Sequence, residues 1–262
     1  MLDAQATQAA SDLLFDHWRA GTVLDALPET LRPATRAEGY AVQAHLQTRS
    51  RRPLFGWKIA ATSTAGQQHI NVEAPLAGRL LAEMVSENGA VLPFGANRMR
   101  VAEAEFAFGM GRDLPPSALP YTVDEVMAAV ATLHSAIEVP DSRFADFTRA
   151  GAAQLIADNA CAHQFVLGPP VAADWRGLDL AAHPVRGSVD GAVAAGRGSN
   201  ALGDPRLALT WLANELSGLG ITLAAGQVVT TGTCVAPMPI GPGVEVVADL
   251  DILGRTTMRF TG

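Results

Sequence analysis

Two glutamates stand two residues apart in an otherwise apolar stretch from Arg100 to Gly111. Side chains alternate between the two faces of a strand, so Glu103 and Glu105 share one face while Phe106 points to the other. Neighbouring carboxylates repel each other and lose hydration when buried, so such a pair takes up a proton, stays in water or binds a cation. A half-exposed strand with an acidic outer face is the alternative. A metal site at this stretch needs a third ligand.

The third ligand is predicted at Glu138, within the stretch from Ala136 to Arg143. The same alternation directs the aliphatic neighbours of Glu138 to the core and its carboxylate to the opposite face. Three carboxylates from two strands leave positions on an octahedral ion for water and a chelating substrate. Oxygen ligands of this kind favour magnesium or manganese. The sequence therefore predicts one Mg²⁺ or Mn²⁺ bound by Glu103, Glu105 and Glu138.

A single lysine, Lys58, lies among apolar residues in a predicted strand over 55–60. One interpretation is a side chain on an edge strand whose stem is buried and whose ammonium reaches water. The other is an active-site ammonium that faces an anionic substrate or a metal-bound oxygen. In the second case we expect burial beside the metal to lower the pKa of Lys58 and to suit it to proton transfer.

The composition indicates a globular protein that acts on a small molecule. Of the 262 residues, 48% are hydrophobic, which is ample for a core, and the formal net charge is −7. An acidic chain is not attracted to nucleic acid or to anionic membrane. No apolar run approaches the roughly 18 residues of a membrane span, and the N-terminus does not resemble a signal peptide, so a cytoplasmic location is expected. Cys161 and Cys234 have no metal-ligand spacing and are predicted to be packed thiols.

Apolar periodicity predicts helices at 4–20 and 35–50, which form a helical N-terminal element over 1–52 ahead of a catalytic domain over 53–262. A capping box at Thr122 opens a further helix that is expected to end near Ser135, and Asp204 caps another. The segment 66–89 is expected to be irregular and is a candidate lid. Short strands are predicted at 227–231, 244–250 and 256–260, with a hairpin turn in 191–198. No βαβ repeat or dinucleotide fingerprint is present, so the fold class is α+β.

Several motifs resemble those of the 2-keto-4-pentenoate hydratase and 4-oxalocrotonate decarboxylase family, within the fumarylacetoacetase-like superfamily. The resemblance extends over nearly the whole chain. The motifs are Gly56-Trp57-Lys58-Ile59, Val101-Ala102-Glu103-Ala104-Glu105, Gly111-Arg112-Asp113-Leu114-Pro115, Ala136-Ile137-Glu138-Val139-Pro140-Asp141-Ser142-Arg143, Asp158-Asn159-Ala160, Phe165-Val166-Leu167-Gly168, Gly203-Asp204-Pro205, Trp211-Leu212-Ala213-Asn214 and Val229-Thr230-Thr231-Gly232.

The resemblance implies a fumarylacetoacetase-like fold with a curved β-sheet core. It also implies that the family's metal ligands correspond to the three glutamates, that its active-site lysine is Lys58, and that Leu76, Thr231 and Gly232 lie at the substrate. Hydratases of this family often have an acid at the position of Leu76, and relatives often have serines where this chain has Cys161 and its two successors. These departures concern the activation of water and the shape of the pocket wall.

The expected function is metal-dependent hydration of a short 2-hydroxy-2,4-dienoate or unsaturated 2-oxo acid, as in the degradation of aromatic compounds by meta cleavage. A decarboxylase of a 4-oxalocrotonate type would use the same residues, and Leu76 favours it. A C–C bond hydrolase would need a base for water, and the sequence does not identify one. A non-catalytic protein with a structural ion is the remaining alternative. The resemblance further implies a homo-oligomer and association with a related pathway enzyme.

Overall fold

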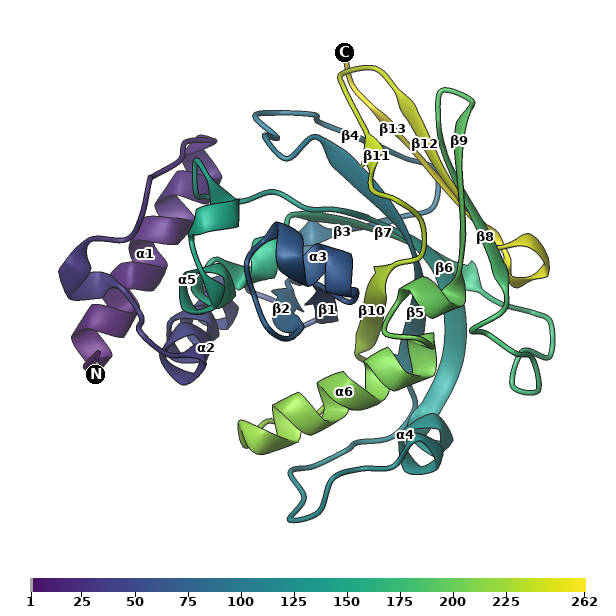
Figure 1. Cartoon of the computed structure of the whole chain (residues 1–262), viewed down its shortest axis with the longest axis horizontal. Coiled ribbons are helices and arrows are strands. Elements are labelled where there is room, and N and C mark those ends of the chain that lie inside the picture. Colours follow the sequence, from purple (N-terminus) through teal and green to yellow (C-terminus); the bar gives the residue numbers. More distant parts are fainter. Residues whose placement is uncertain (1) are drawn as a thin grey trace.

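Two β-sheets form the centre of the structure, a computed structural model that describes residues 2–262 (Figure 1). The larger sheet has the strand order β2-β1-β10-β5-β6-β7-β3, and β11 pairs with one end of β5. Its strands are β1 (Gly56–Ala60), β2 (Leu76–Leu80), β3 (Val85–Glu87), β5 (Val101–Met110), β6 (Val130–Val139), β7 (Gln164–Pro170), β10 (Val228–Thr233) and β11 (Met238–Pro239).

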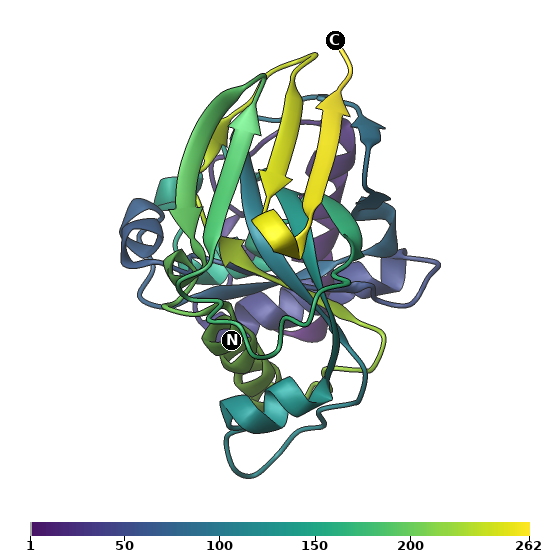
Figure 2. The same cartoon turned by 90° about the vertical axis from the view of Figure 1, so that its right-hand side faces the viewer.

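The smaller sheet has five strands in the order β4-β13-β12-β8-β9 and is seen from its outer side in Figure 2. Its strands are β4 (Ala90–Leu92), β8 (Pro184–Val189), β9 (Ala192–Arg197), β12 (Glu245–Asp249) and β13 (Arg255–Phe260). The predicted hairpin turn lies between β8 and β9, where Asp190 and Gly191 both have positive φ. Paired residues with positive φ are typical of two-residue hairpin loops.

Six α-helices surround the larger sheet, with α1, α2 and α5 on one side and α4 and α6 below it in the view of Figure 1. They are α1 (Ala4–Ala20), α2 (Arg36–Ala44), α3 (Thr64–His69), α4 (Val123–Ala129), α5 (Ala152–Ala157) and α6 (Pro205–Gly218). The capping boxes at Thr35 and Thr122 are both formed, and Asp204 caps α6 with Pro205 in its first turn. No helix within residues 2–262 is long and apolar enough to span a membrane.

The apolar residues of α1 and α2 join the same hydrophobic core as the large sheet. Ala10 and Leu14 of α1 and Val42 of α2 belong to this core together with Phe106 and Ile137 from the sheet. The mixed α and β architecture confirms the predicted fold class. The division of the chain at residue 52 stays a prediction.

The structure corrects the expectation that 66–89 is irregular. Helix α3 lies at the start of this segment, where the Ser63 side chain accepts a hydrogen bond from the Gly66 amide. Strand β2 follows and pairs antiparallel with β1 over its whole length. The sequence signal was weak because β2 carries Ala77 and Gly78, which are both depleted in strands.

The helix that was predicted to run from Thr122 to about Ser135 ends at Ala129, and Val130 already belongs to β6. The stretch after Val130 has apolar residues at helical spacing, but Thr132 to Glu138 pair in continuous register with β5. Pairing with a central strand therefore overrides the local periodicity. The second predicted helix is also shorter, because α2 ends at Ala44 and a 3₁₀ segment, His45–Arg49, follows it.

Candidate active site

The three predicted glutamates converge in the structure. Glu103 lies directly opposite Glu138 in the antiparallel pairing of β5 with β6, and Glu105 is two residues along β5 on the same face. One oxygen from each of the three carboxylates lies within 4.8 Å of the others. Glu105 and Glu138 are 1% and 0% exposed, whereas Glu103 is partly exposed. The alternative of a strand with a solvated acidic face therefore does not describe this site.

Residues of β10 bind one carboxylate oxygen of Glu105, and the second oxygen accepts no hydrogen bond from the described residues. Its Oε2 accepts hydrogen bonds from the Gly232 amide at 2.8 Å and from the Thr230 hydroxyl. The Oε1 atom of Glu105 and both carboxylate oxygens of Glu138 are buried and accept no hydrogen bond from the described residues. Buried oxygens without hydrogen bonds are costly, and a divalent cation is the ligand that satisfies several of them together.

Burial raises the pKa values of the three carboxyl groups, and repulsion between carboxylates adds to the shift at Glu105 and Glu138. Burial raises the pKa of Glu138 to about 8, although the Lys58 ammonium opposes this shift. Burial and the charges of Glu103 and Glu138 raise the pKa of Glu105 well above its usual range. The pKa of Glu103 is raised by burial and is also opposed by Lys58. At neutral pH the protein groups alone therefore keep part of this cluster protonated, and a cation would replace those protons.

Lys58 lies in β1, an interior strand between β2 and β10, and is 3% exposed. Its Nζ donates a hydrogen bond to the Ala160 carbonyl at 3.0 Å and lies 3.3 Å from Glu138 Oε1. The edge-strand interpretation of Lys58 is thus wrong. Burial alone lowers the pKa of Lys58, but the charges of Glu138 and Glu103 raise it above its ordinary value. This shift comes from the protein groups alone, so the lowered pKa that we expect beside a bound metal stays a prediction.

Space for the Lys58 stem comes from Gly78, its partner across β1 and β2. A Cβ atom on Gly78 would lie 2.4 Å from the Asn159 carbonyl oxygen and 3.1 Å from Lys58 Cγ. A side chain at position 78 would therefore displace both the lysine and the turn that binds it. Gly78, which made the strand hard to recognise from the sequence, is required because the Asn159 carbonyl and the Lys58 stem both approach its Cα closely.

The Ala160 carbonyl, which accepts the hydrogen bond from Lys58, belongs to a strained turn. Asn159, Ala160 and Cys161 all have positive φ, with values of 57°, 51° and 60°. Three successive left-handed residues that are not glycine cost energy, and such strain is often found at functional sites. Asn159 stabilises the turn because its side chain bonds both the amide and the carbonyl of Arg79 in β2.

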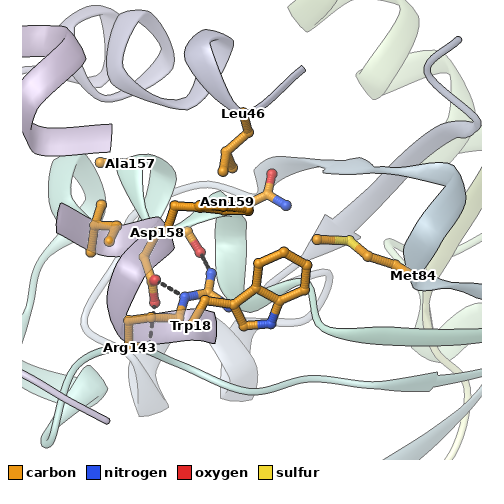
Figure 3. Close-up of a pocket in the computed structure, with 9 residues that line it drawn as sticks. Trp18, Leu46, Met84, Arg143, Ala157, Asp158 and Asn159 are labelled. Atoms are coloured by element: carbon orange, nitrogen blue, oxygen red, sulfur yellow. Dashed lines mark hydrogen bonds and ion pairs between the residues drawn. The ribbon is translucent and has the colours of Figure 1, made fainter. Parts of the chain in front are cut away.

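A buried ion pair between Arg143 and Asp158, the residue that precedes this turn, stabilises it (Figure 3). The Arg143 guanidinium points at the carboxylate and the carbonyl of Asp158, and it also donates to the Ala162 carbonyl at 3.1 Å. Ser142 donates a further hydrogen bond of 2.7 Å to Asp158. The motif around Glu138 thus has two parts: Glu138 in β6 belongs to the carboxylate cluster, and Ser142 and Arg143 anchor the turn that binds Lys58.

A cavity of about 630 Å³ opens beside the carboxylates. Lys58, Glu103, Gly232 and Cys161 line it together with many apolar side chains. Burial raises the pKa of the Cys161 thiol to about 12, and both cysteines are free and buried, which confirms that they are packed thiols. His134 lies outside this cavity, and its ring contacts the Gly168 carbonyl and the Thr132 hydroxyl.

Of the residues that the resemblance placed at the substrate, Leu76 and Gly232 line the cavity. Leu76 is the first residue of β2 and is fully buried. Gly232 has φ of 97°, and a Cβ there would lie 2.0 Å from the Thr62 hydroxyl oxygen. Thr231 does not line the cavity, since its hydroxyl donates to the Phe106 carbonyl. Its neighbour Thr230, which contacts Glu105, was not singled out from the sequence.

Comparisons with known proteins agree with this site. The model of the fumarylacetoacetate (FAA) hydrolase C-terminal family matches residues 36–261. The chain belongs to this family. It is 31% identical to 2-hydroxyhexa-2,4-dienoate hydratase of Comamonas testosteroni and 32% identical to 2-keto-4-pentenoate hydratase of Burkholderia vietnamiensis, in each case over the full length of both chains.

Among solved structures, 4-oxalocrotonate decarboxylase from Pseudomonas putida G7, complexed with magnesium and adipate, has a TM-score of 0.90 to this chain. The two chains are 25% identical, and the match covers 99% of each. The same decarboxylase complexed with calcium and acetate has a TM-score of 0.88. These relatives confirm the fold and the predicted family.

Proposed function

We propose that this chain is a divalent-metal-dependent hydratase that adds water to a short 2-hydroxy-2,4-dienoate. The observation that carries the proposal is the convergence, beside one cavity, of Lys58 and three carboxylates, of which Glu105 and Glu138 are buried and have oxygens that accept no hydrogen bond. The hydratase names of relatives that match over their full length support it. In this role we expect a soluble small-molecule enzyme that assembles as a homo-oligomer, which size-exclusion chromatography with light scattering would test.

Glu103, Glu105 and Glu138 would hold the ion, and the free oxygens of Glu105 and Glu138 fit this role. We propose Mg²⁺ or Mn²⁺, because three carboxylates are a hard, oxygen-only ligand set. When bound, the cation would supply positive charge to the carboxylate and the 2-oxygen of the substrate and so favour the enolate. The hydrogen bonds from Thr230 and Gly232 fix one oxygen of Glu105 and so orient its other oxygen.

Lys58 would hold and move the proton in the reaction. Its Nζ donates one hydrogen bond to the Ala160 carbonyl and forms an ion pair with Glu138, so the ammonium can still donate to a substrate in the cavity. In the first step the 2-hydroxyl proton leaves and C5 of the dienol gains a proton, which gives a 2-oxo-3-enoate. In the second step water adds its oxygen to C4, and C3 gains a proton. Lys58 can relay these protons without a net change in its own charge.

A 4-oxalocrotonate-type decarboxylase is the second candidate, because loss of carbon dioxide from such a substrate gives the same enolate. The structural similarity to 4-oxalocrotonate decarboxylase favours it. Leu76 favours it as well, because a fully buried leucine offers no base for water. A C–C bond hydrolase would need a base at the cavity too. The sole histidine among the described residues that line the cavity is His69, which is exposed at its rim.

The test is to incubate the purified protein, with Mg²⁺ or Mn²⁺, with 2-hydroxypenta-2,4-dienoate and 2-hydroxyhexa-2,4-dienoate. We expect the dienol absorbance to fall and a 4-hydroxy-2-oxo acid to form, and we expect chelation by EDTA to abolish both. A parallel incubation with 2-oxohex-3-enedioate measures release of carbon dioxide. If carbon dioxide is released while no dienoate gains water, the decarboxylase replaces the hydratase. If no substrate is converted with either metal, the enzymatic proposal is wrong.

A further inference from the structure

The cavity has one charged end and one apolar end. The charged end is built by interior strands, with Lys58 from β1, Glu103 from β5 and Gly232 from β10. The rest of the wall comes from the start of β2, from α3, from α5 and from connecting segments, and apolar side chains outnumber polar ones such as Ser63, His69 and Asn200. Those used in the argument below are Ile70, Leu76, Met99, Phe147, Leu155 and Val235.

Among the described residues, the apolar wall carries no lysine or arginine that could pair with a second anionic group, and its one imidazole, His69, is exposed. Within the described residues, Lys58 is the only lysine or arginine that lines the cavity, and it already contacts Glu138 and the Ala160 carbonyl. Arg149 lies two residues after Phe147 and is exposed, but it is not part of the wall. A carboxylate that enters the apolar end would lose water and gain no ion pair, which costs several kcal/mol on general grounds.

The cavity as a whole also has more room than a short acid requires. The volume of about 630 Å³ corresponds to roughly twenty water molecules at about 30 Å³ each. A short dienoate chelated at the charged end would leave much of this volume to water. A longer apolar substituent would displace that water and contact side chains such as Ile70 and Phe147, which is favourable.

We propose that this cavity selects 2-hydroxydienoates that carry an apolar substituent at the end remote from the carboxylate, and that it discriminates against those with a second carboxylate. The inference rests on the proposed function, because it assumes that the carboxylate and the 2-oxygen occupy the charged end. It adds the wall of Ile70, Leu76, Phe147 and Leu155 as the determinant of the substrate tail.

The experiment measures binding, not turnover, with saturated 2-oxo acids that cannot take up water. The probes are pyruvate, 2-oxohexanoate, 2-oxooctanoate and 2-oxoadipate, each titrated by calorimetry into the Mn²⁺-loaded protein. We expect affinity to rise about threefold for each methylene added to the tail. We expect 2-oxoadipate, whose tail ends in a carboxylate, to bind at least about tenfold more weakly than 2-oxohexanoate.

Phe147 provides a matched pair of variants, because it is only half-buried and tolerates a polar substitute. Phe147→Arg places a cation at the apolar wall, and Phe147→Gln removes the ring without adding charge. We expect Phe147→Arg to bind 2-oxoadipate at least about tenfold more tightly than Phe147→Gln does. Equal binding by the two variants would mean that the tail lies elsewhere and would overturn this assignment of the wall.

Two further outcomes separate this inference from the proposed function. If the parent protein binds 2-oxoadipate as tightly as 2-oxohexanoate, and Arg149→Gln removes that affinity, then a cation at the rim binds the second carboxylate. The tail selectivity is then wrong, while metal-dependent binding of 2-oxo acids stands. If no 2-oxo acid binds in the presence of Mn²⁺, the proposed function itself fails and the tail selectivity falls with it.

Discussion

Replacing Glu138 by glutamine should have opposite effects on metal affinity and on the stability of the metal-free protein. Glutamine keeps the shape of the side chain but removes one charged ligand from the site. We expect the affinity for Mg²⁺ or Mn²⁺ to fall at least about tenfold, equivalent to roughly 1.4 kcal/mol. The metal-free variant should nevertheless be as stable as the parent protein or more stable, because the charge that is lost is buried and crowded.

The magnitude follows from the pKa of Glu138, which is raised from its ordinary value near 4.5 to about 8. The folded protein therefore holds a proton that the unfolded chain releases, so the stability of the metal-free parent falls as pH rises from about 4.5 to 8. Each pH unit in that window is worth at most about 1.4 kcal/mol. Since Lys58 and Glu103 share the titration, the total is on the order of a few kcal/mol. Glu138→Gln removes this contribution.

The assay is chemical denaturation in EDTA at pH 5 and at pH 8, combined with calorimetric titration of Mn²⁺. At pH 5 the variant and the parent should unfold alike, and at pH 8 the variant should be the more stable of the two. Glu73→Gln is the matched control, because Glu73 is exposed and lies outside the cavity. Unchanged Mn²⁺ affinity in Glu138→Gln, or a clear loss of stability at pH 8, would refute the reasoning.

Three further substitutions test other parts of the site. Lys58→Met keeps the buried stem but removes the ammonium, so turnover should fall on the order of a hundredfold or more while the thermal midpoint moves little. If the variant unfolds but its residual folded fraction is fully active, the lysine is structural. Leu76→Asp should raise the rate of dienoate hydration, while solvent exchange at C3 of a saturated 2-oxo acid changes little; slower hydration would place the activation of water elsewhere. Asp158→Asn removes the buried counter-charge of Arg143, so the free energy of unfolding should fall by about 3–5 kcal/mol in denaturant titration, and a loss below about 1 kcal/mol would contradict this.

Strand alternation was sufficient to identify the three carboxylates, because one face of a strand is a local property. Glu103 and Glu105 had to share a face wherever β5 lay in the sheet. That Glu138 lies opposite Glu103 depends on the register of β5 with β6, which the sequence alone does not give. The family resemblance implied that the same three glutamates are the metal ligands, but it did not give the register either.

The parts of the site that escaped prediction depend on contacts between residues far apart in the chain. Thr230 binds Glu105 across 125 positions, and the Ala160 carbonyl binds Lys58 across 102. No local pattern marks a backbone carbonyl as a partner for a lysine. A left-handed turn at Ala160 was also unexpected, since alanine seldom adopts positive φ, and neighbours such as Arg79 must stabilise it.

The charged end of the cavity cannot by itself decide between hydration and decarboxylation, because both reactions place negative charge on the same enolate. The decision therefore lies with the wall that faces the remote carbons, where hydration needs a positioned water and decarboxylation needs a dry surface around the leaving carboxylate. Leu76 belongs to that wall and lies beside the strand of Lys58, because β2 pairs directly with β1. Its side chain can change while the backbone pairing with Ala60 persists. The chemistry of this wall can therefore change without disturbing the carboxylates that would hold the metal.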